Sequence, residues 1–159
     1  MKFRFFIPFI ASLLCLPACK KCENKQKPGA VVQKAANFKG AFSFVSTYNE
    51  KTKILTQKIK LKDGFHAYGE GEKIGRPANM IIDNKDGWQM IGKPILPNGQ
   101  MKDLGILGKS IVLDKKFEIS AKVDGGKGPI VGALRMQICS SNACDKPRSH
   151  QFEVKNILK

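Results

Sequence analysis

The chain has 159 residues and carries 28 Lys and Arg against 13 Asp and Glu, which gives a formal net charge of +15. Hydrophobic residues make up 42% and charged residues 26% of the sequence, a globular composition that excludes a disordered or collagen-like chain. The length fits one domain or two. No apolar run after the N-terminus reaches the ~18 residues of a membrane-spanning helix, which argues against an integral membrane channel or transporter.

The N-terminus is typical of a bacterial export signal. A short basic start precedes an apolar core over residues 5–16, which is too short to span a bilayer comfortably. The core ends in Leu16-Pro17-Ala18-Cys19, which resembles a lipobox. The resemblance implies cleavage before Cys19 and attachment of lipid to that cysteine.

Cleavage at this site predicts a signal peptide over 1–18, a lipidated tether over 19–36 and a folded domain over 37–159. Cys19 and Cys22 also have the C-x-x-C spacing of redox motifs. Such motifs normally lie at a strand-to-helix junction, whereas this one follows an apolar signal core, so lipidation is the preferred interpretation. We expect a periplasmic protein anchored to a bilayer, in the outer rather than the inner membrane.

The body of the chain predicts short strands separated by turns. Apolar–polar alternation or short apolar runs, which are signals of strands, occur over 38–48, 54–61, 80–82, 88–91, 111–113, 117–123 and 134–138. Asp-Gly or Asn-Gly pairs, which supply the positive φ of tight turns, occur at 63–64, 86–87, 98–99 and 124–125. A strand and turn every ~8–12 residues predicts an all-β fold, an immunoglobulin-like antiparallel β-sandwich.

Cys139 and Cys144 stand at the two ends of a four-residue polar loop. If the flanking runs pair as a hairpin, the two Cα atoms would fall within the ~4.4–6.8 Å that a disulfide requires. Closing so short a loop stabilises a fold by only ~2 kcal/mol, and a polar loop would leave the bond accessible to an attacking thiolate. The spacing leaves two interpretations open, thiol–disulfide exchange and a structural staple.

Four segments in the same order resemble the N-terminal periplasmic domain of the thiol:disulfide interchange protein DsbD, an immunoglobulin-like domain that shuttles electrons. The first is a strand that ends in Asp-Gly and aromatics, and the second is a Leu-Pro-x-Gly turn. The third is a cap loop and the fourth is an active-site hairpin. In this sequence they occupy 59–68, 94–99, 104–110 and 136–147. The resemblance extends over roughly residues 38–154.

The resemblance implies a redox relay through the cysteine pair. Cys144 would be the sulfur that a partner thiolate attacks, and Cys139 would be the resolving sulfur. His66 and Tyr68 would lie near the pair, where they would orient the sulfurs or assist proton transfer.

A cap loop would shield the reduced thiols until a partner displaces it. Its residues would be Asp103, Leu104, Ile106 and Leu107, with Ile106 and Leu107 covering the pair. This chain departs from the family at three points: the cysteines are one residue closer together, the cap is aliphatic rather than aromatic, and Leu104 and Gly105 replace the acidic residues expected before it.

The resemblance also implies the partners. Electrons would come from a membrane-bound thiol–disulfide reductase and pass to periplasmic thioredoxin-like proteins, without a cofactor. Neither the transmembrane relay nor the thioredoxin-like domain of full-length DsbD is present up to Lys159, so we expect the donor to be a separate protein. The lysines are not interleaved with aromatics, so no nucleic-acid partner is expected.

Two other functions remain open. One is a non-redox binding lipoprotein whose disulfide only shapes a loop and whose basic surface meets anionic envelope components. The other is a Cu(I) carrier, since thioether sulfur suits that ion. Met80, Met90, Met101 and Met136 are too widely spread for a Met-x-Met cluster, so core packing is the simpler account and no metal site is expected.

Overall fold

The computed structural model describes residues 38–105 and 108–155 of the chain. The predicted signal, tether and lipid anchor lie outside these ranges, with Cys19 and Cys22, and stay predictions. The same holds for the predicted cover of the cysteine pair by Ile106 and Leu107. Within the described ranges, no helix is long and apolar enough to cross a membrane.

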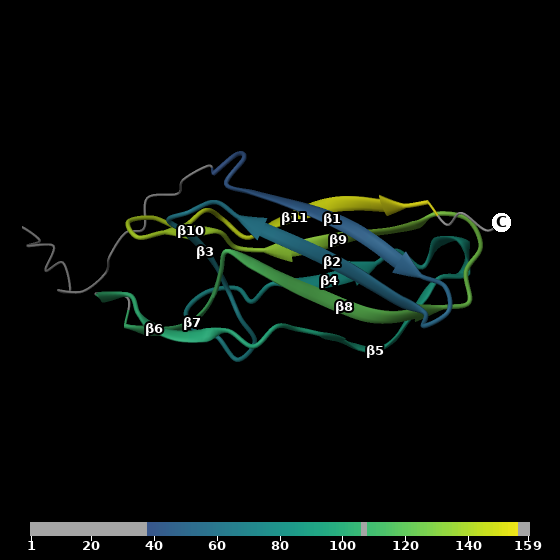
Figure 1. Ribbon diagram of the computed structural model, residues 1–159, viewed down its shortest axis with the longest axis horizontal. Helices are drawn as coiled ribbons and strands as arrows, with labels where there is room; N and C mark the ends of the chain where they lie inside the picture. The colour runs from purple at the N-terminus through teal and green to yellow at the C-terminus, as the bar shows by residue number, and fades with distance from the viewer. Residues whose placement is uncertain (1–37, 106–107, 156–159) are drawn as a thin grey trace, which may run out of the picture. The chain divides into compact units, whose positions relative to one another are not determined.

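Almost all regular structure in the described part is β-strand (Figure 1). One 3-10 turn, η1, spans Lys85–Gly87. The strands are β1 (Phe42–Asn49), β2 (Ile54–Leu61), β3 (Phe65–Tyr68), β4 (Asn79–Ile82), β5 (Gln89–Ile95), β6 (Gln100–Asp103), β7 (Lys109–Asp114), β8 (Lys116–Asp124), β9 (Ile130–Met136), β10 (Cys139–Ser140) and β11 (Arg148–Val154).

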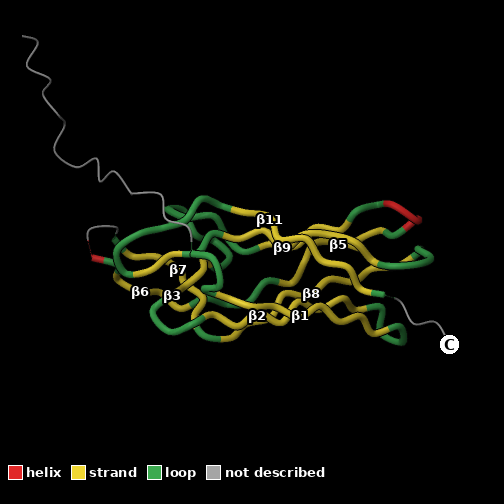
Figure 2. Tube along the Cα trace, turned by 90° about the horizontal axis from the view of Figure 1, so that it is seen from above, coloured by secondary structure: helices red, strands yellow, loops and turns green. Residues whose placement is uncertain are grey.

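The strands pair antiparallel in three sheets. Figure 2 shows β1 and β2 in one layer of the sandwich and β9 and β11 in the other. The first sheet has the order β1-β2-β8-β5, the second β11-β9-β4 and the third β10-β3-β7-β6. The strands of the third sheet gather at one end of the sandwich, on the left of Figure 1. The predicted all-β, immunoglobulin-like sandwich is confirmed.

Period-two alternation decides which face of each strand enters the core. On β8, Phe117, Ile119, Ala121 and Val123 are all buried and their neighbours are not. Side chains of β2, β4, β8 and β9 belong to one hydrophobic cluster. Burial of this apolar surface, worth about 25 cal/mol per Å² removed from water, holds the first two sheets together.

Most predicted strands are present, and the differences have simple causes. The strand predicted over 54–61 has the same bounds as β2. β9 begins at Ile130 and ends at Met136 rather than spanning 134–138. No strand was predicted for β6, because all four of its residues are exposed and carry no alternation.

Glycine conformation fits three of the four predicted turns. Gly64, Gly87 and Gly125 have φ values of 81°, 79° and 88°, as Asp-Gly turns require. The prediction for Gly99 is wrong, because its φ is not positive. A side chain at Gly99 would overlap Ile111, so this glycine permits a close approach of chain segments.

Candidate functional site: a buried disulfide

A disulfide joins Cys139 and Cys144 at the end of the sandwich that carries the third sheet. Their Cα atoms lie 4.0 Å apart, slightly closer than expected from the sequence. The hairpin is tight because the Ser140 N–H donates to the Ala143 carbonyl at 2.8 Å, and the Ala143 N–H donates to the Ser140 hydroxyl at 3.2 Å. The cysteines therefore face each other across a turn that its own hydrogen bonds hold closed.

The disulfide is buried. Cys139 is 0% exposed and Cys144 is 5% exposed. They form a cluster with Tyr68 and Val112, against which Leu104 packs. The expected accessible bond is therefore wrong, because both cysteines pack against Tyr68 of β3 and Val112 of β7. A thiolate must approach a disulfide sulfur in line, so attack requires this cover to move.

Tyr68 contacts both sulfurs. Its hydroxyl oxygen lies 3.3 Å from the Cys139 Sγ and 3.5 Å from the Cys144 Sγ. Disulfide sulfurs carry no proton, so the hydroxyl is the donor in this oxidised state. Burial, reinforced by the charge of Glu72, raises the pKa of Tyr68 above its ordinary value. The hydroxyl therefore stays protonated and able to donate at neutral pH.

Gly75 leaves room for the Tyr68 ring, since a methyl group at position 75 would overlap that ring. Tyr68 is 1% exposed, so its ring is enclosed by the surrounding residues. We expect Gly75→Ala to lower the free energy of unfolding by about 1–3 kcal/mol through overpacking. Urea denaturation measures this loss. The same substitution in a Tyr68→Ala background is the control, and an equal loss in both backgrounds would contradict the assigned cause.

His66 lies beside the disulfide on the same strand as Tyr68. Its backbone pairs with Cys139 on one side and Asp114 on the other. Its ring stands edge-on to that of Tyr68, with centroids 5.6 Å apart. The Nε2 atom is buried without a hydrogen-bond partner among the described residues. Burial lowers the pKa of His66, with Lys102 adding to that effect and Asp114 opposing it.

We expect the fold to lose stability as the pH falls below about 6.5, the ordinary pKa of histidine. In this window the unfolded chain takes up a proton at His66, whereas the folded chain keeps that ring neutral down to its lower pKa. Stability therefore rises with pH across the window. Each unit of pKa depression contributes about 1.4 kcal/mol.

Urea midpoints measured between about pH 5 and pH 8 check this expectation. His66→Gln should flatten the dependence. His150→Gln should flatten the remaining part of the dependence, because the pKa of this second histidine is also lowered by burial, with Arg148 adding to the effect. An unchanged slope in His66→Gln would refute the role of His66.

The cap loop is described in part. The Gly105 N–H donates to the Asp103 carboxylate at 2.9 Å, and the Leu104 N–H donates to the Gly108 carbonyl at 2.9 Å. Leu104 is the described cap residue that packs against the disulfide cluster. A hollow of about 350 Å³ opens beside it, and His66 and Val112 also line this hollow.

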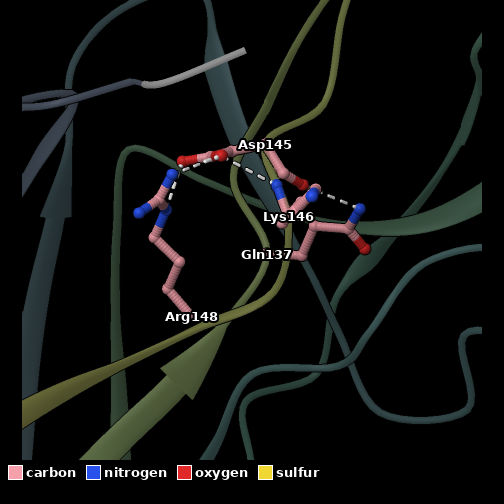
Figure 3. A network of polar contacts seen from close by, with 4 residues as sticks. All are labelled: Gln137, Asp145, Lys146 and Arg148. Atoms are coloured by element: carbon pink, nitrogen blue, oxygen red, sulfur yellow. Dashed lines mark hydrogen bonds and ion pairs between the residues drawn. The ribbon is translucent and has the colours of Figure 1, made fainter. Parts of the chain in front are cut away.

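The residue after Cys144 is held firmly, which sequence reasoning missed. Asp145 is 7% exposed, and its carboxylate accepts hydrogen bonds from Arg148 at 2.8 and 3.1 Å (Figure 3). It also accepts from the Lys146 N–H at 2.8 Å. The Gln137 amide donates to the Asp145 carbonyl at 3.1 Å. The hydrogen bond from Arg148 is the main cause that lowers the pKa of Asp145. The Asp-x-x-Arg spacing was the available sequence signal, and it is a weak one.

The sequence family described as thiol:disulfide interchange protein DsbD, N-terminal, matches residues 33–156. The chain belongs to this family. No curated protein sequence matches the chain. Family membership and the Cys139–Cys144 disulfide together assign it to thiol–disulfide exchange in general.

Two solved structures share this fold. The reduced N-terminal domain of Neisseria meningitidis DsbD matches with a TM-score of 0.59 and 16% identity, over 76% of this chain and 90% of that one. The N-terminal periplasmic domain of ScsB from Proteus mirabilis matches with a TM-score of 0.50 and 18% identity, over 72% of this chain and 45% of that one.

The remaining candidate residues lie away from the disulfide cluster. Met80 and Met136 are buried in the main core, whereas Met101 is 63% exposed. His150 packs edge-on against Phe42, with ring centroids 4.7 Å apart. Among the described residues, no three or more His, Cys, Asp or Glu are placed to hold a metal ion.

Proposed function

We propose that this protein relays electrons between protein partners through the Cys139–Cys144 disulfide. It takes them from a membrane-bound thiol–disulfide reductase and passes them to periplasmic thioredoxin-like proteins. The observation that carries the proposal is the Tyr68 hydroxyl within 3.3 and 3.5 Å of the two sulfurs, in a domain of the DsbD family. No cofactor is required, because interconversion of a dithiol and a disulfide itself transfers two electrons.

The reducing half of the relay is two exchange steps. A donor thiolate attacks the Cys144 Sγ, the intramolecular S–S bond breaks, and Cys139 leaves as a thiolate that takes up a proton. The second thiol of the donor, as a thiolate, then attacks the donor's first sulfur, which is bonded to Cys144 in the mixed disulfide. This step releases Cys144, which also takes up a proton, and leaves the donor oxidised and this protein as a dithiol.

The oxidising half reverses the order. The Cys144 thiolate attacks the disulfide of the acceptor and forms a mixed disulfide, while one acceptor sulfur leaves as a thiolate. Cys139, once deprotonated, attacks the Cys144 Sγ and re-forms the Cys139–Cys144 bond. The acceptor departs as a dithiol after taking up two protons.

Tyr68 supports the reducing half by stabilising the leaving sulfur of this protein. A thiolate leaves faster when its pKa is lower, and a hydrogen bond to the charged form lowers that pKa. The Tyr68 hydroxyl is nearer to Cys139 than to Cys144, which matches Cys139 as the leaving sulfur. Because no described residue forms a hydrogen bond with the His66 Nε2 atom, we assign His66 the exchange of protons near this site.

Leu104 acts as the described part of a gate. It packs against the buried pair, and the hollow lined by His66 and Val112 lies next to it. A partner that displaces Leu104 would gain access to Cys144. In the absence of a partner the cover limits attack by other thiols.

We further propose that the protein is a periplasmic lipoprotein of the outer membrane. The lipobox-like segment ending in Cys19 supports a signal peptide over 1–18, a lipidated tether over 19–36 and a domain over 37–159. The periplasmic description of the matching ScsB domain supports the same compartment.

The second candidate is a non-redox binding lipoprotein in which the disulfide only shapes its loop. The burial of both cysteines, at 0% and 5% exposure, favours this candidate, because inaccessible disulfides exchange slowly.

The reduction potential separates the two functions. A soluble form that begins at Lys20 and carries Cys22→Ser would be equilibrated with glutathione or dithiothreitol buffers, and the dithiol fraction would be measured. We expect a potential of about −180 to −270 mV, the range of exchange proteins. A potential below about −300 mV, typical of structural disulfides, would reject the relay in favour of the binding lipoprotein.

A further inference from the structure

A basic groove lies beside the disulfide hairpin, against the outer face of β9. Its volume is about 730 Å³, and all the charged residues that line it are cations: Arg76, Arg135, Lys146 and Arg148. Arg135 points outward from β9, between the buried Leu134 and Met136. In register it pairs with Asn79 and Ser149, neutral polar residues that also line the groove.

Three of these cations lack a counter-ion in the described part of the chain. Arg148 is bound by Asp145 at 2.8 Å. Within residues 38–105 and 108–155, no carboxylate lies within ion-pair distance of Arg76, Arg135 or Lys146. A concave site lined by one sign of charge concentrates the electrostatic field and attracts oppositely charged groups. The groove therefore favours an anionic occupant.

Hydrogen bonds connect the groove to the disulfide. Lys146 is two residues from Cys144 in the chain. The Arg76 N–H donates to the Gln137 side-chain oxygen at 2.9 Å, and the Gln137 amide donates to the Asp145 carbonyl at 3.1 Å. Arg76 is thus connected through Gln137 to the segment that follows the disulfide, and Lys146 belongs to that segment. An occupant would be held at a defined position relative to Cys144.

We propose that this groove binds a cluster of acidic side chains on the redox partner and so directs the partner thiol to Cys144. The proposal rests on the proposed function and names the chemistry of its partner. Guanidinium groups present paired donors that match carboxylate geometry. Because Arg76 and Arg135 are exposed, binding requires only partial desolvation. Complementary charge of this kind raises association rates and orients partners.

The first test measures binding without redox chemistry. A fluorescein-labelled, cysteine-free oligoglutamate peptide would be titrated with the protein at low salt, and anisotropy would report binding. We expect Arg76→Gln/Arg135→Gln to weaken binding by about five-fold. The double variant removes two exposed ion pairs with glutamates of the peptide, and each such pair is weak. Lys60→Gln/Lys122→Gln removes the same charge from the outer faces of β2 and β8 and should change binding less than two-fold.

The peptide results can also overturn the proposal. Equal binding of oligoglutamate and oligoglutamine peptides would do so. Equal losses in the groove variant and the control variant would do so as well, because they would indicate an effect of net charge. Vesicles containing phosphatidylglycerol test a lipid occupant. Vesicle binding that falls in the groove variant, without any preference for glutamate, would assign the groove to lipid headgroups instead.

The second test separates docking from the relay itself. Rates of reduction of the Cys139–Cys144 disulfide would be measured with dithiothreitol and with glutamate-rich and glutamine-rich cysteine peptides. We expect the glutamate-rich peptide to react about five-fold faster than its glutamine counterpart, and the groove variant to lose this difference. Rapid reduction by dithiothreitol with equal peptide rates would overturn docking and retain the relay. A disulfide that dithiothreitol cannot reduce would overturn the relay, and the docking role with it.

Discussion

Cys144→Ser is expected to abolish electron transfer, whereas Cys139→Ser should accumulate a covalent adduct with a partner. Without Cys144 there is no sulfur at the position we assign to partner attack. Without Cys139 the Cys144 thiolate still attacks a partner disulfide, but no resolving thiolate follows, so the mixed disulfide persists. Both variants lack the disulfide and so lose about 2 kcal/mol from the same short loop.

The matched loss of stability makes the two variants controls for each other. Each would be expressed in a bacterial envelope, quenched with acid to stop exchange, and analysed by non-reducing electrophoresis and mass spectrometry. An adduct confined to Cys139→Ser supports the assignment of roles. Adducts confined to Cys144→Ser would reverse the roles of the two sulfurs. A lack of adducts in both variants would contradict the relay.

Tyr68→Phe should slow reduction of the disulfide by about ten-fold. The substitution removes a hydroxyl that lies 3.3 Å from Cys139 and 3.5 Å from Cys144. A hydrogen bond to a charged group contributes about 1.5–3 kcal/mol, and about 1.4 kcal/mol corresponds to ten-fold in rate. The pKa of the leaving thiol should rise in the variant, which alkylation rates of the reduced protein measure as a function of pH.

The sequence offers a matched control for this substitution. Tyr48 is the other tyrosine of the chain, and its hydroxyl donates to the Val123 carbonyl at 3.3 Å, away from the cysteines. Tyr48→Phe should leave the reduction rate unchanged. If both variants react at the wild-type rate, Tyr68 has only a packing role.

The burial of the disulfide also changes how the rates should be interpreted. Attack on Cys144 requires displacement of Leu104 or movement of the hairpin, since the pair has almost no exposure. A small thiol must wait for this opening, whereas a docked partner can promote it. The two sulfurs therefore lie beside a hydrogen-bond donor, Tyr68, but are buried from attacking thiols.

The sequence by itself determined the features that depend on near neighbours. The alternation in β2 and β8 predicted strands and their buried faces, because successive side chains of a strand point to opposite sides. The close spacing of Cys139 and Cys144 predicted a local disulfide, since few residues separate the two sulfurs. Resemblance to the DsbD family supplied His66 and Tyr68 as neighbours of the pair.

Only the tertiary structure decided what surrounds the disulfide. Tyr68 is 71 and 76 positions from the two cysteines, and no local pattern carries information on such a contact. Val112 belongs to the disulfide cluster and Leu104 packs against it because β3, β6 and β7 pair in one sheet. The basic groove likewise joins the segment before β4, the outer face of β9 and the residues after Cys144. Burial and charge at this site arise from strand pairing between segments far apart in the chain, whereas the strands themselves arise from local alternation.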